Sequence, residues 1–218
     1  MILLRSLAAA VTFVLLSQAG YAQTAPQSPP SQSGDTVLSR DAVLRDAEIP
    51  AAGNPDGDIT VVEYFDFQCP YCRKVHADLQ RLIRDDRKVR VVYKDWPILG
   101  EVSKTAAQLV QAAKYQGKFV AAHDALMGYK GRLTAANLED ILTKAGVDVA
   151  KAKADAQAND AAIKATLARN DAQAEAFGFV ATPSFIVGTF RVPGAMELAM
   201  FKQAIKEARE LQKKNGKQ

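Results

Sequence analysis

The sequence predicts an α/β fold in which one mixed sheet is divided by a block of helices. Two segments rich in β-branched residues flank an amphipathic segment between residues 59 and 93. Residues 103–177 are alanine-rich with helical periodicity, and strand patterns return after residue 179. Because strands that alternate with helices indicate an α/β domain, the helical block is predicted to be an insertion into it.

The first part of this domain is predicted to be a strand–helix–strand unit. Residues 59–67 are a run of β-branched and aromatic residues, typical of a buried strand. Residues 70–85 have an apolar face at helical spacing, and residues 89–93 form a second strand pattern. Such a unit joins two parallel strands through a right-handed crossover.

Capping residues predict where the inserted helices begin and end. The predicted N-terminal caps are Ser103, Thr134, Asp148, and Asn159 or Asp160. Gly146 and Gly178 are predicted to end two of the helices. After the insertion, residues 184–187 and 190–192 are predicted to form a hairpin, and residues 196–211 a final helix.

The N-terminal residues have the pattern of an export signal. Arg5 precedes an apolar run over residues 7–16, and small residues lead up to Ala22. The apolar run is too short to span a membrane. Residues 1–22 are therefore predicted to be a signal peptide cleaved after Ala22, and the mature chain is expected in the periplasm.

The rest of the chain is predicted to have four parts. Residues 23–49 comprise a disordered linker rich in Pro, Ser and Gln, followed by a short amphipathic element. That element could pack on the body of the protein or on another subunit. The first half of the α/β fold is expected at residues 50–102, the helical domain at 103–178 and the second half at 179–218.

The two cysteines of the chain stand where the first predicted strand meets the helix. A Cys-x-x-Cys at this position, here Cys69 and Cys72, is typical of a redox site. Free N–H groups and the helix dipole stabilise a thiolate, so we expect the pKa of Cys69 to lie below about 8.5. Pro70 suits the first helical turn. Cys72 can close a disulfide with Cys69 or resolve a mixed disulfide.

Other uses of this cysteine pair fit the sequence less well. A structural disulfide across a two-residue loop gives little entropic stabilisation. Zinc needs more ligands, and His76 and His123 are isolated and are expected to be surface or core histidines, so no metal site is predicted. Covalent haem requires a histidine where Arg73 stands. Two unrelated buried thiols do not suit an exported protein, which meets oxidants.

One acidic residue interrupts the predicted buried strand. Glu63 lies six residues before Cys69. A buried carboxylate is costly unless it has a partner or a function, although an edge position facing water would also explain it. The net charge of the chain, +4, is too small to indicate a nucleic-acid partner.

Two sequence blocks resemble the DsbA-like family of exported thiol–disulfide oxidoreductases. The blocks are Phe65-Asp66-Phe67-Gln68-Cys69-Pro70-Tyr71-Cys72 and Ala181-Thr182-Pro183-Ser184-Phe185. They lie at the two ends of the helical block, and the resemblance covers roughly residues 50–212. It implies a thioredoxin-like fold, with a central mixed sheet and an inserted all-helical domain.

The resemblance also implies roles for the acid and the cysteines. Cys69 would be the exposed nucleophile and Cys72 its buried partner, and the two would form the redox disulfide. Glu63 would be the buried acid that takes the Cys72 proton. Lys94 is a weaker candidate as a partner of Glu63.

The residues expected to bind substrate are Pro70, Tyr71, Thr182 and Pro183. Pro70 and Tyr71 lie between the cysteines, and Pro183 would be a cis-proline beside them. In this family the residue before the cis-proline, here Thr182, pairs its backbone with an extended substrate peptide.

The function implied is a thiol–disulfide oxidoreductase that forms or exchanges disulfides in exported proteins, without a soluble cofactor. Its expected partners are unfolded or misoxidised exported proteins and a membrane redox partner that resets the cysteines. The Cys-Pro-Tyr-Cys motif and Thr182 are also similar to isomerases such as DsbG, which carry an N-terminal dimerisation domain. A short N-terminal helix could still oligomerise, as in suppressor-of-copper-sensitivity relatives. The direction of the reaction and the oligomeric state stay open.

Two readings from other classes also remain. A periplasmic copper(I)-binding protein could hold its ion with the two thiolates, since linear coordination suffices for that ion. A structural surface protein that uses the fold as a scaffold fits the intact cysteine pair least well.

Overall fold

The computed structural model describes residues 37–215, so the predicted signal peptide and linker lie outside the described residues. A five-stranded sheet has the order β1-β3-β2-β4-β5. Its strands are β1 Ala51–Gly53, β2 Ile59–Phe65, β3 Val89–Asp95, β4 Ser184–Val187 and β5 Phe190–Pro193. The β2–β3 pair is parallel and the other neighbouring pairs are antiparallel. The predicted mixed sheet and its parallel pair are therefore confirmed.

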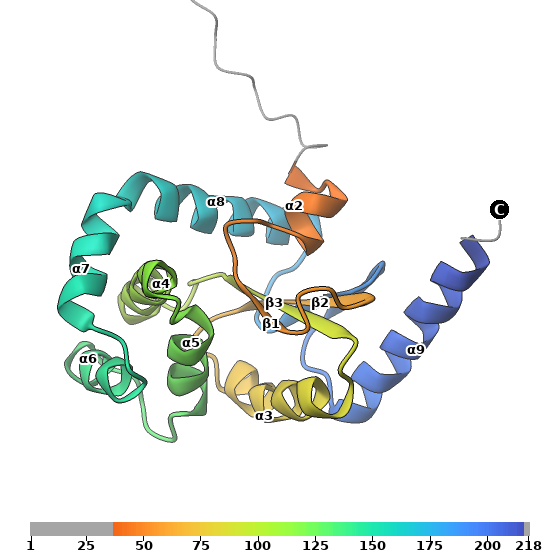
Figure 1. Ribbon diagram of the computed structural model, residues 1–218, viewed down its shortest axis with the longest axis horizontal. Helices are drawn as coiled ribbons and strands as arrows, with labels where there is room; N and C mark the ends of the chain where they lie inside the picture. The colour runs from red at the N-terminus through yellow and green to blue at the C-terminus, as the bar shows by residue number, and fades with distance from the viewer. Residues whose placement is uncertain (1–36, 216–218) are drawn as a thin grey trace, which may run out of the picture. The chain divides into compact units, whose positions relative to one another are not determined.

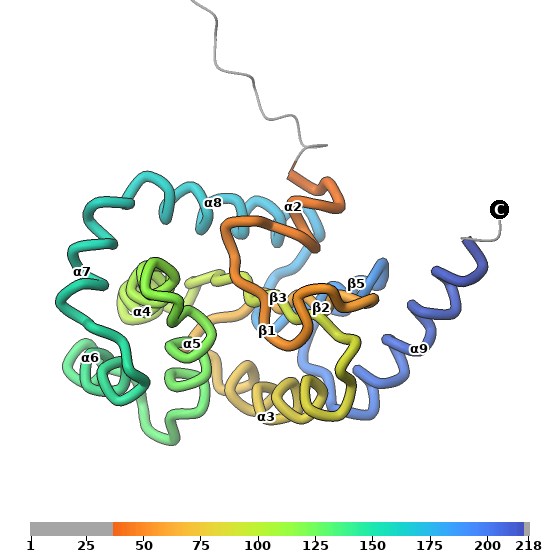
Figure 2. Tube along the Cα trace, in the orientation of Figure 1, coloured from red at the N-terminus to blue at the C-terminus, as the bar shows by residue number. Residues whose placement is uncertain are grey.

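Helices cover both faces of this sheet (Figure 1). The helices are α2 Arg40–Leu44, α3 Pro70–Asp85, α4 Glu101–Ala113, α5 Phe119–Gly128, α6 Ala135–Lys144, α7 Val149–Ala158, α8 Asp160–Ala176 and α9 Leu198–Asn215. α3 and α9 lie on one face, and α2 and α8 lie on the other. The chain leaves the sheet after β3, passes through α4 to α8 and returns at β4, as Figure 2 shows.

The alternation of side chains along β2 decides which residues can meet. Tyr64 points to the α8 face, where its hydroxyl donates to Gln173 Oε1 at 3.0 Å. Its neighbour Glu63 therefore points to the α3 and α9 face. Phe185, which lies opposite Glu63 in the β2–β4 register, packs on Phe201 of α9 with ring centroids 5.1 Å apart.

The predicted amphipathic element is helix α2, and it packs on the body of the protein. Ser39 caps it by accepting the N–H of Ala42. The buried Lys94 of β3 donates to the carbonyl of Ala42 at 3.0 Å and to Asp46 Oδ2 at 3.3 Å. Arg169 of α8 also binds Asp46, at 2.9 Å from its Nε. Residues just before β1 are thus fixed to the sheet and to α8.

The predicted helix caps are confirmed in part. Thr134 forms a capping box with Asn137, and Asp148 accepts the N–H of Lys151. Asn159 stands at the N-cap position of α8 without a side-chain capping bond. The prediction for Ser103 is wrong, because α4 already begins at Glu101 and Ser103 is buried within its first turn.

Strand β1 was absent from the expected elements. Its three residues, Ala-Ala-Gly, have little strand propensity. They become a strand because they pair antiparallel with β3. Within residues 37–215, no helix is long and apolar enough to cross a membrane.

Candidate active site

Helix α3 begins at the cysteine pair. Cys69 is its N-cap residue, and the Cys69 sulfur accepts the N–H of Cys72 at 3.4 Å. Pro70 is the first residue of the helix, where a missing N–H costs no hydrogen bond. The Cys69 sulfur therefore lies at the N-terminus of a 16-residue helix, the position that favours a thiolate.

The two cysteines differ in acidity. Hydrogen bonding from the Cys72 side chain is the largest cause that lowers the pKa of Cys69, to about 6, and burial opposes it. The side chain of Thr182 and the backbone N–H groups of Cys72 and Tyr71 add to the lowering. Burial raises the pKa of Cys72 well above its usual range, with the hydrogen bond to Cys69 as the next cause. At neutral pH Cys69 is a thiolate and Cys72 a thiol.

A loop distant in sequence covers the Cys69 sulfur. The Thr182–Pro183 peptide bond is cis, as the family resemblance implies. The carbonyl oxygen of Thr182 lies 3.3 Å from Cys69 Sγ, close enough to accept from the thiol form. The expectation that Cys69 is exposed is wrong, because under this loop the residue is only 3% exposed. Both cysteines are free thiols here, so the expected redox disulfide is not formed in this structure.

Apolar side chains next to the cysteines face solvent. Tyr71, between the two cysteines, is 63% exposed, and Val180, two residues before Thr182, is 90% exposed. Ile98 and Leu99, in the segment after β3, are also exposed. Large apolar groups on the surface mark sites of interaction when they gather around a site.

Glu63 lies in the interior on the same face of the sheet as α3. Neither carboxyl oxygen has a hydrogen-bond partner within residues 37–215. Burial raises the pKa of Glu63 well above its usual range, and the charge of Cys69 raises it further. The charge of Glu63 is in turn among the causes that raise the pKa of Cys72. Because burial favours the neutral form, an isolated buried carboxyl of this kind can exchange a proton with a nearby group.

The predicted pairing of Glu63 with Lys94 is wrong. Glu63 is in register with Tyr93, and Tyr64 is in register with Lys94. Since successive side chains in a strand point to opposite faces, Lys94 lies on the α8 face, away from Glu63. There it binds Asp46 of the segment that follows α2.

Sequence reasoning missed a residue that positions the loop before Cys69. Asp66 is buried, and it accepts the N–H of Gln68 at 2.7 Å, the N–H of Leu99 at 2.8 Å and the hydroxyl of Ser103 at 2.6 Å. It thus joins the end of β2 to the start of α4. The sequence signal that could have identified Asp66 is a carboxylate that stands between two phenylalanines in an apolar run.

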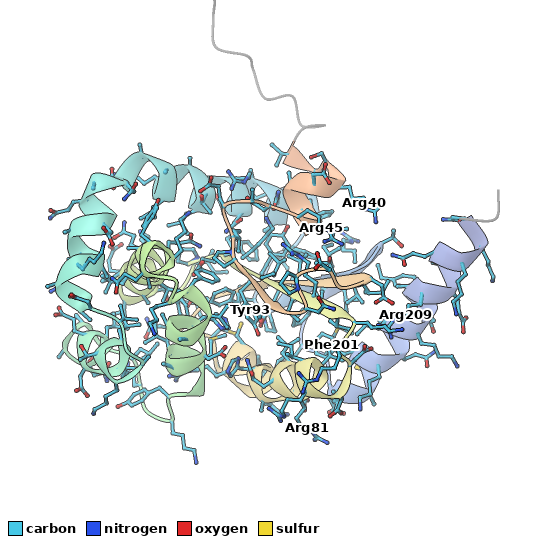
Figure 3. All side chains as sticks on the ribbon, in the orientation of Figure 1. Arg40, Arg45, Arg81, Tyr93, Phe201 and Arg209 are labelled. Atoms are coloured by element: carbon cyan, nitrogen blue, oxygen red, sulfur yellow. The ribbon has the colours of Figure 1, made fainter. Side chains whose placement is uncertain are left out.

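The two histidines are buried, and they lie together. Their ring centroids are 5.5 Å apart, and Asp124 Oδ1 lies 3.8 Å from His76 Nε2 and 3.1 Å from His123 Nδ1. His123 stacks on the buried ring of Tyr93, which is labelled in Figure 3, at 3.7 Å between ring centroids. Of the two expected positions, surface or core, both histidines occupy the core, and the expectation that they are isolated is wrong. Burial lowers the pKa of both imidazoles, that of His76 to about 4, so both are neutral at pH 7.

This fold and cysteine pair define a class of protein, the thioredoxin-like thiol–disulfide oxidoreductases. Residues 46–207 match the thioredoxin family model, and the chain belongs to this family. It is 42% identical to a thioredoxin-like oxidoreductase from Silicibacter pomeroyi DSS-3, with a TM-score of 0.75 over 79% of this chain and 98% of that one.

Other solved structures share the fold. The catalytic domain of Proteus mirabilis ScsC is 28% identical with a TM-score of 0.68, over 77% of this chain and 93% of that one. The thiol-disulfide exchange protein alpha-DsbA2 from Wolbachia pipientis has a TM-score of 0.72 at 24% identity, over 80% of this chain and 95% of that one. A periplasmic thioredoxin-like protein from Salmonella enterica is 25% identical with a TM-score of 0.66, over 77% of this chain and 94% of that one.

Curated relatives contain a similar segment within longer chains. The chain is 26% identical over 195 residues to a protein named Na(+)/H(+) antiporter NhaA 1 from Salinispora arenicola, a match that covers 84% of this chain. It spans about 29% of the length of that relative.

Proposed function

We propose that the protein forms or exchanges disulfides in exported polypeptides in the periplasm, with Cys69 and Cys72 as its redox pair. The observation that carries this proposal is the contrast between the two thiols beside a cis-proline loop. Cys69, at the helix N-terminus, is the acidic thiol, and Cys72 is buried with a raised pKa. A pair with one attacking sulfur and one protected sulfur suits disulfide exchange.

The reaction begins with the Cys69–Cys72 disulfide. A substrate thiolate attacks the Cys69 sulfur, a mixed disulfide forms, and the bond between Cys69 and Cys72 breaks. Cys72 leaves as a thiolate and takes the proton that Glu63 holds. A second substrate thiolate then attacks the substrate sulfur of the mixed disulfide, and Cys69 leaves as a thiolate. The substrate is oxidised by two electrons, and the cysteine pair is reduced.

The acidity of Cys69 favours this direction. A low pKa makes Cys69 a good leaving group and stabilises the reduced form, so the oxidised form is the stronger oxidant. A membrane protein that accepts electrons from the reduced pair would reset it. In the isomerase direction, which the Cys-Pro-Tyr-Cys motif and Thr182 also fit, the Cys69 thiolate instead attacks a wrong substrate disulfide.

The surface around the cysteines is suited to bind unfolded exported proteins as substrates. The exposed side chains of Tyr71 and Val180 offer apolar contacts to an extended polypeptide. The backbone of Thr182, beside the Cys69 sulfur, is placed to pair with such a chain in the manner of strand addition.

Two cysteine variants test the proposal. Cys69→Ser is expected to abolish disulfide formation in a reduced, unfolded model protein, and full activity of this variant would refute the scheme. Cys72→Ser is expected to accumulate mixed disulfides that reducing agent releases. If none is recovered from periplasmic extract, Cys72 is not the resolving cysteine.

A further inference from the structure

Two histidines and a carboxylate meet between α3 and α5, outside the cysteine pair. His76 comes from α3, and His123 and Asp124 come from α5. One possible ligand atom from each residue lies within 4.8 Å of the other two. Asp124 Oδ1 is 3.1 Å from His123 Nδ1 and 3.8 Å from His76 Nε2. Ligand atoms of a tetrahedral ion with bonds of about 2.0–2.1 Å lie roughly 3.3 Å apart. The two spacings from Asp124 Oδ1 are close to this value, and the nitrogens of the two histidines, which lie within 4.8 Å of each other, would move closer on binding.

No hydrogen bond among the described residues explains why the polar ring of His76 is buried. The residue is buried, yet neither ring nitrogen makes a hydrogen bond to any residue in the part of the chain that the structure describes. Its Nδ1 is fully enclosed without a partner, and its Nε2 faces Asp124 beyond hydrogen-bond range. Buried polar groups are normally paired, and those that are not call for an explanation.

The charge of the cluster favours a cation. Among residues 37–215, no lysine or arginine pairs with Asp124, whose partners are Gln80 and the two histidines. Gln80 donates to Asp124 Oδ1 at 3.0 Å, a hydrogen bond that can hold a metal-binding carboxylate in orientation. The Asp124 carboxylate thus stands beside the two imidazoles with no cationic side chain paired to it in the part of the chain that the structure describes.

We infer that His76, His123 and Asp124 bind a divalent transition-metal ion of the zinc type. Two imidazoles and a carboxylate suit zinc and its neighbours in the first transition row, whereas calcium and magnesium prefer oxygen ligands alone. The Asp124 side chain is 33% exposed, which gives the ion a route of entry and leaves a position for water. The ion would join α5 to the redox helix, one turn beyond Cys72.

The test measures zinc binding in a protein that lacks both thiols. Tag-free Cys69→Ser/Cys72→Ser protein is dialysed against Zn²⁺, and one bound ion per chain is expected. Adding His76→Gln or Asp124→Asn is expected to weaken zinc binding by roughly 100-fold, because loss of a ligand costs at least as much affinity as loss of a residue that orients one. Asp140→Asn, which changes an exposed aspartate on α6, is the matched control and is expected to leave binding unchanged.

A second readout identifies the ligands directly. The chain has two histidines, so imidazole ¹⁵N spectra report on both without ambiguity. Zinc is expected to shift one ring nitrogen of each histidine, which also tests His123 without a substitution in the core. The proposal is refuted if the double serine variant retains no zinc, if His76→Gln and Asp124→Asn bind as tightly as Asp140→Asn, or if neither histidine shifts.

Discussion

At the scale of single residues, the difference in acidity between Cys69 and Cys72 is the property on which exchange depends. Cys72 contributes the largest stabilisation of the Cys69 thiolate, ahead of Thr182 and the backbone at the start of α3. The buried partner therefore tunes the reactive sulfur as well as forming the internal disulfide with it. The effect of Cys72 on Cys69 can be measured by titrating the Cys69 thiol.

We expect the reduced protein to show thiolate absorbance at 240 nm with a midpoint near pH 6, the lowered pKa of Cys69. Cys72→Ala should move the midpoint upward, because it removes the main hydrogen bond to the thiolate. The thiolate adds to the free energy of unfolding above the ordinary thiol pKa, and this contribution is lost as the pH falls through about 6. A midpoint near 8.5 in the wild type would contradict the assignment.

Glu63→Gln separates the proton-transfer role of Glu63 from a structural one. The variant should slow exchange by about 100-fold, the lower end of general acid–base effects. Because the pKa of Glu63 is raised, its contribution to the free energy of unfolding is fully present below the unfolded value near 4.5 and is lost as the pH rises through the folded value. Urea unfolding should therefore show that the free energy of unfolding of the variant increases relative to that of the wild type as the pH rises. Equal pH dependence in both proteins would contradict this.

The matched control is Glu210→Gln, which changes an exposed glutamate on α9. It should alter neither the exchange rate nor the pH dependence of unfolding.

The residues of the candidate site differ in how far the sequence reveals them. Cys69, Cys72 and the Thr182–Pro183 pair stand in short motifs, so their type and order suffice to single them out. The pairing of Lys94 with Asp46 depends on strand register and on which face each side chain occupies. Neither is encoded in local spacing, and for that reason the expected pairing of Glu63 with Lys94 is wrong.

At the scale of elements, the approach of α3 to the sheet depends on the buried Asp66. Three donors from the β2–α3 loop, the segment before α4 and α4 itself meet at this carboxylate. The same loop carries Cys69 to its place under the cis-proline, and the N–H of Cys69 donates to the carbonyl of Asp66 at 3.0 Å.

Asp66→Ala should lower the free energy of unfolding by about 3 kcal/mol or more, because it leaves buried donors without an acceptor. Asp66→Asn keeps one acceptor and should cost less. The comparison is made by urea unfolding of the reduced proteins. Asp140→Ala, at an exposed position, should stay within roughly 0.5 kcal/mol of the wild type, and an equal loss in both alanine variants would contradict the role of Asp66.

Helices and strands with a strong apolar periodicity were predictable, whereas a strand that forms only by pairing with another strand was not. The predicted bounds of α3 match those observed, because its apolar face and Pro70 mark them locally. β1 has no such pattern and exists through pairing with β3. The start of α4 was misplaced because Ser103 resembles a cap, whereas its hydroxyl is directed inward to Asp66.

At the scale of the whole molecule, Asp46 joins three parts of the chain that are far apart in sequence. It follows α2 and binds both Lys94 of β3 and Arg169 of α8. The polar cluster holds the N-terminal helix against the sheet face opposite the cysteines. The chain order gave no indication of this connection.

Asp46→Ala should destabilise the protein by roughly 3 kcal/mol, since it leaves the buried Lys94 ammonium without its counter-ion. Adding Lys94→Met should recover part of the loss, because the double variant no longer buries an unpaired charge. Thermal and urea unfolding would measure both steps. A double variant less stable than Asp46→Ala would contradict this account of the cluster.

The reduction potential of the Cys69–Cys72 couple tests the central claim most directly. The protein is equilibrated with glutathione buffers, and its free thiols are counted. The account predicts an internal disulfide with an oxidising potential, between about −120 mV and −180 mV, because the Cys69 thiolate stabilises the reduced form. A value near −270 mV would make the pair a reductant, and thiols that form no internal disulfide at any buffer ratio would contradict the redox function altogether.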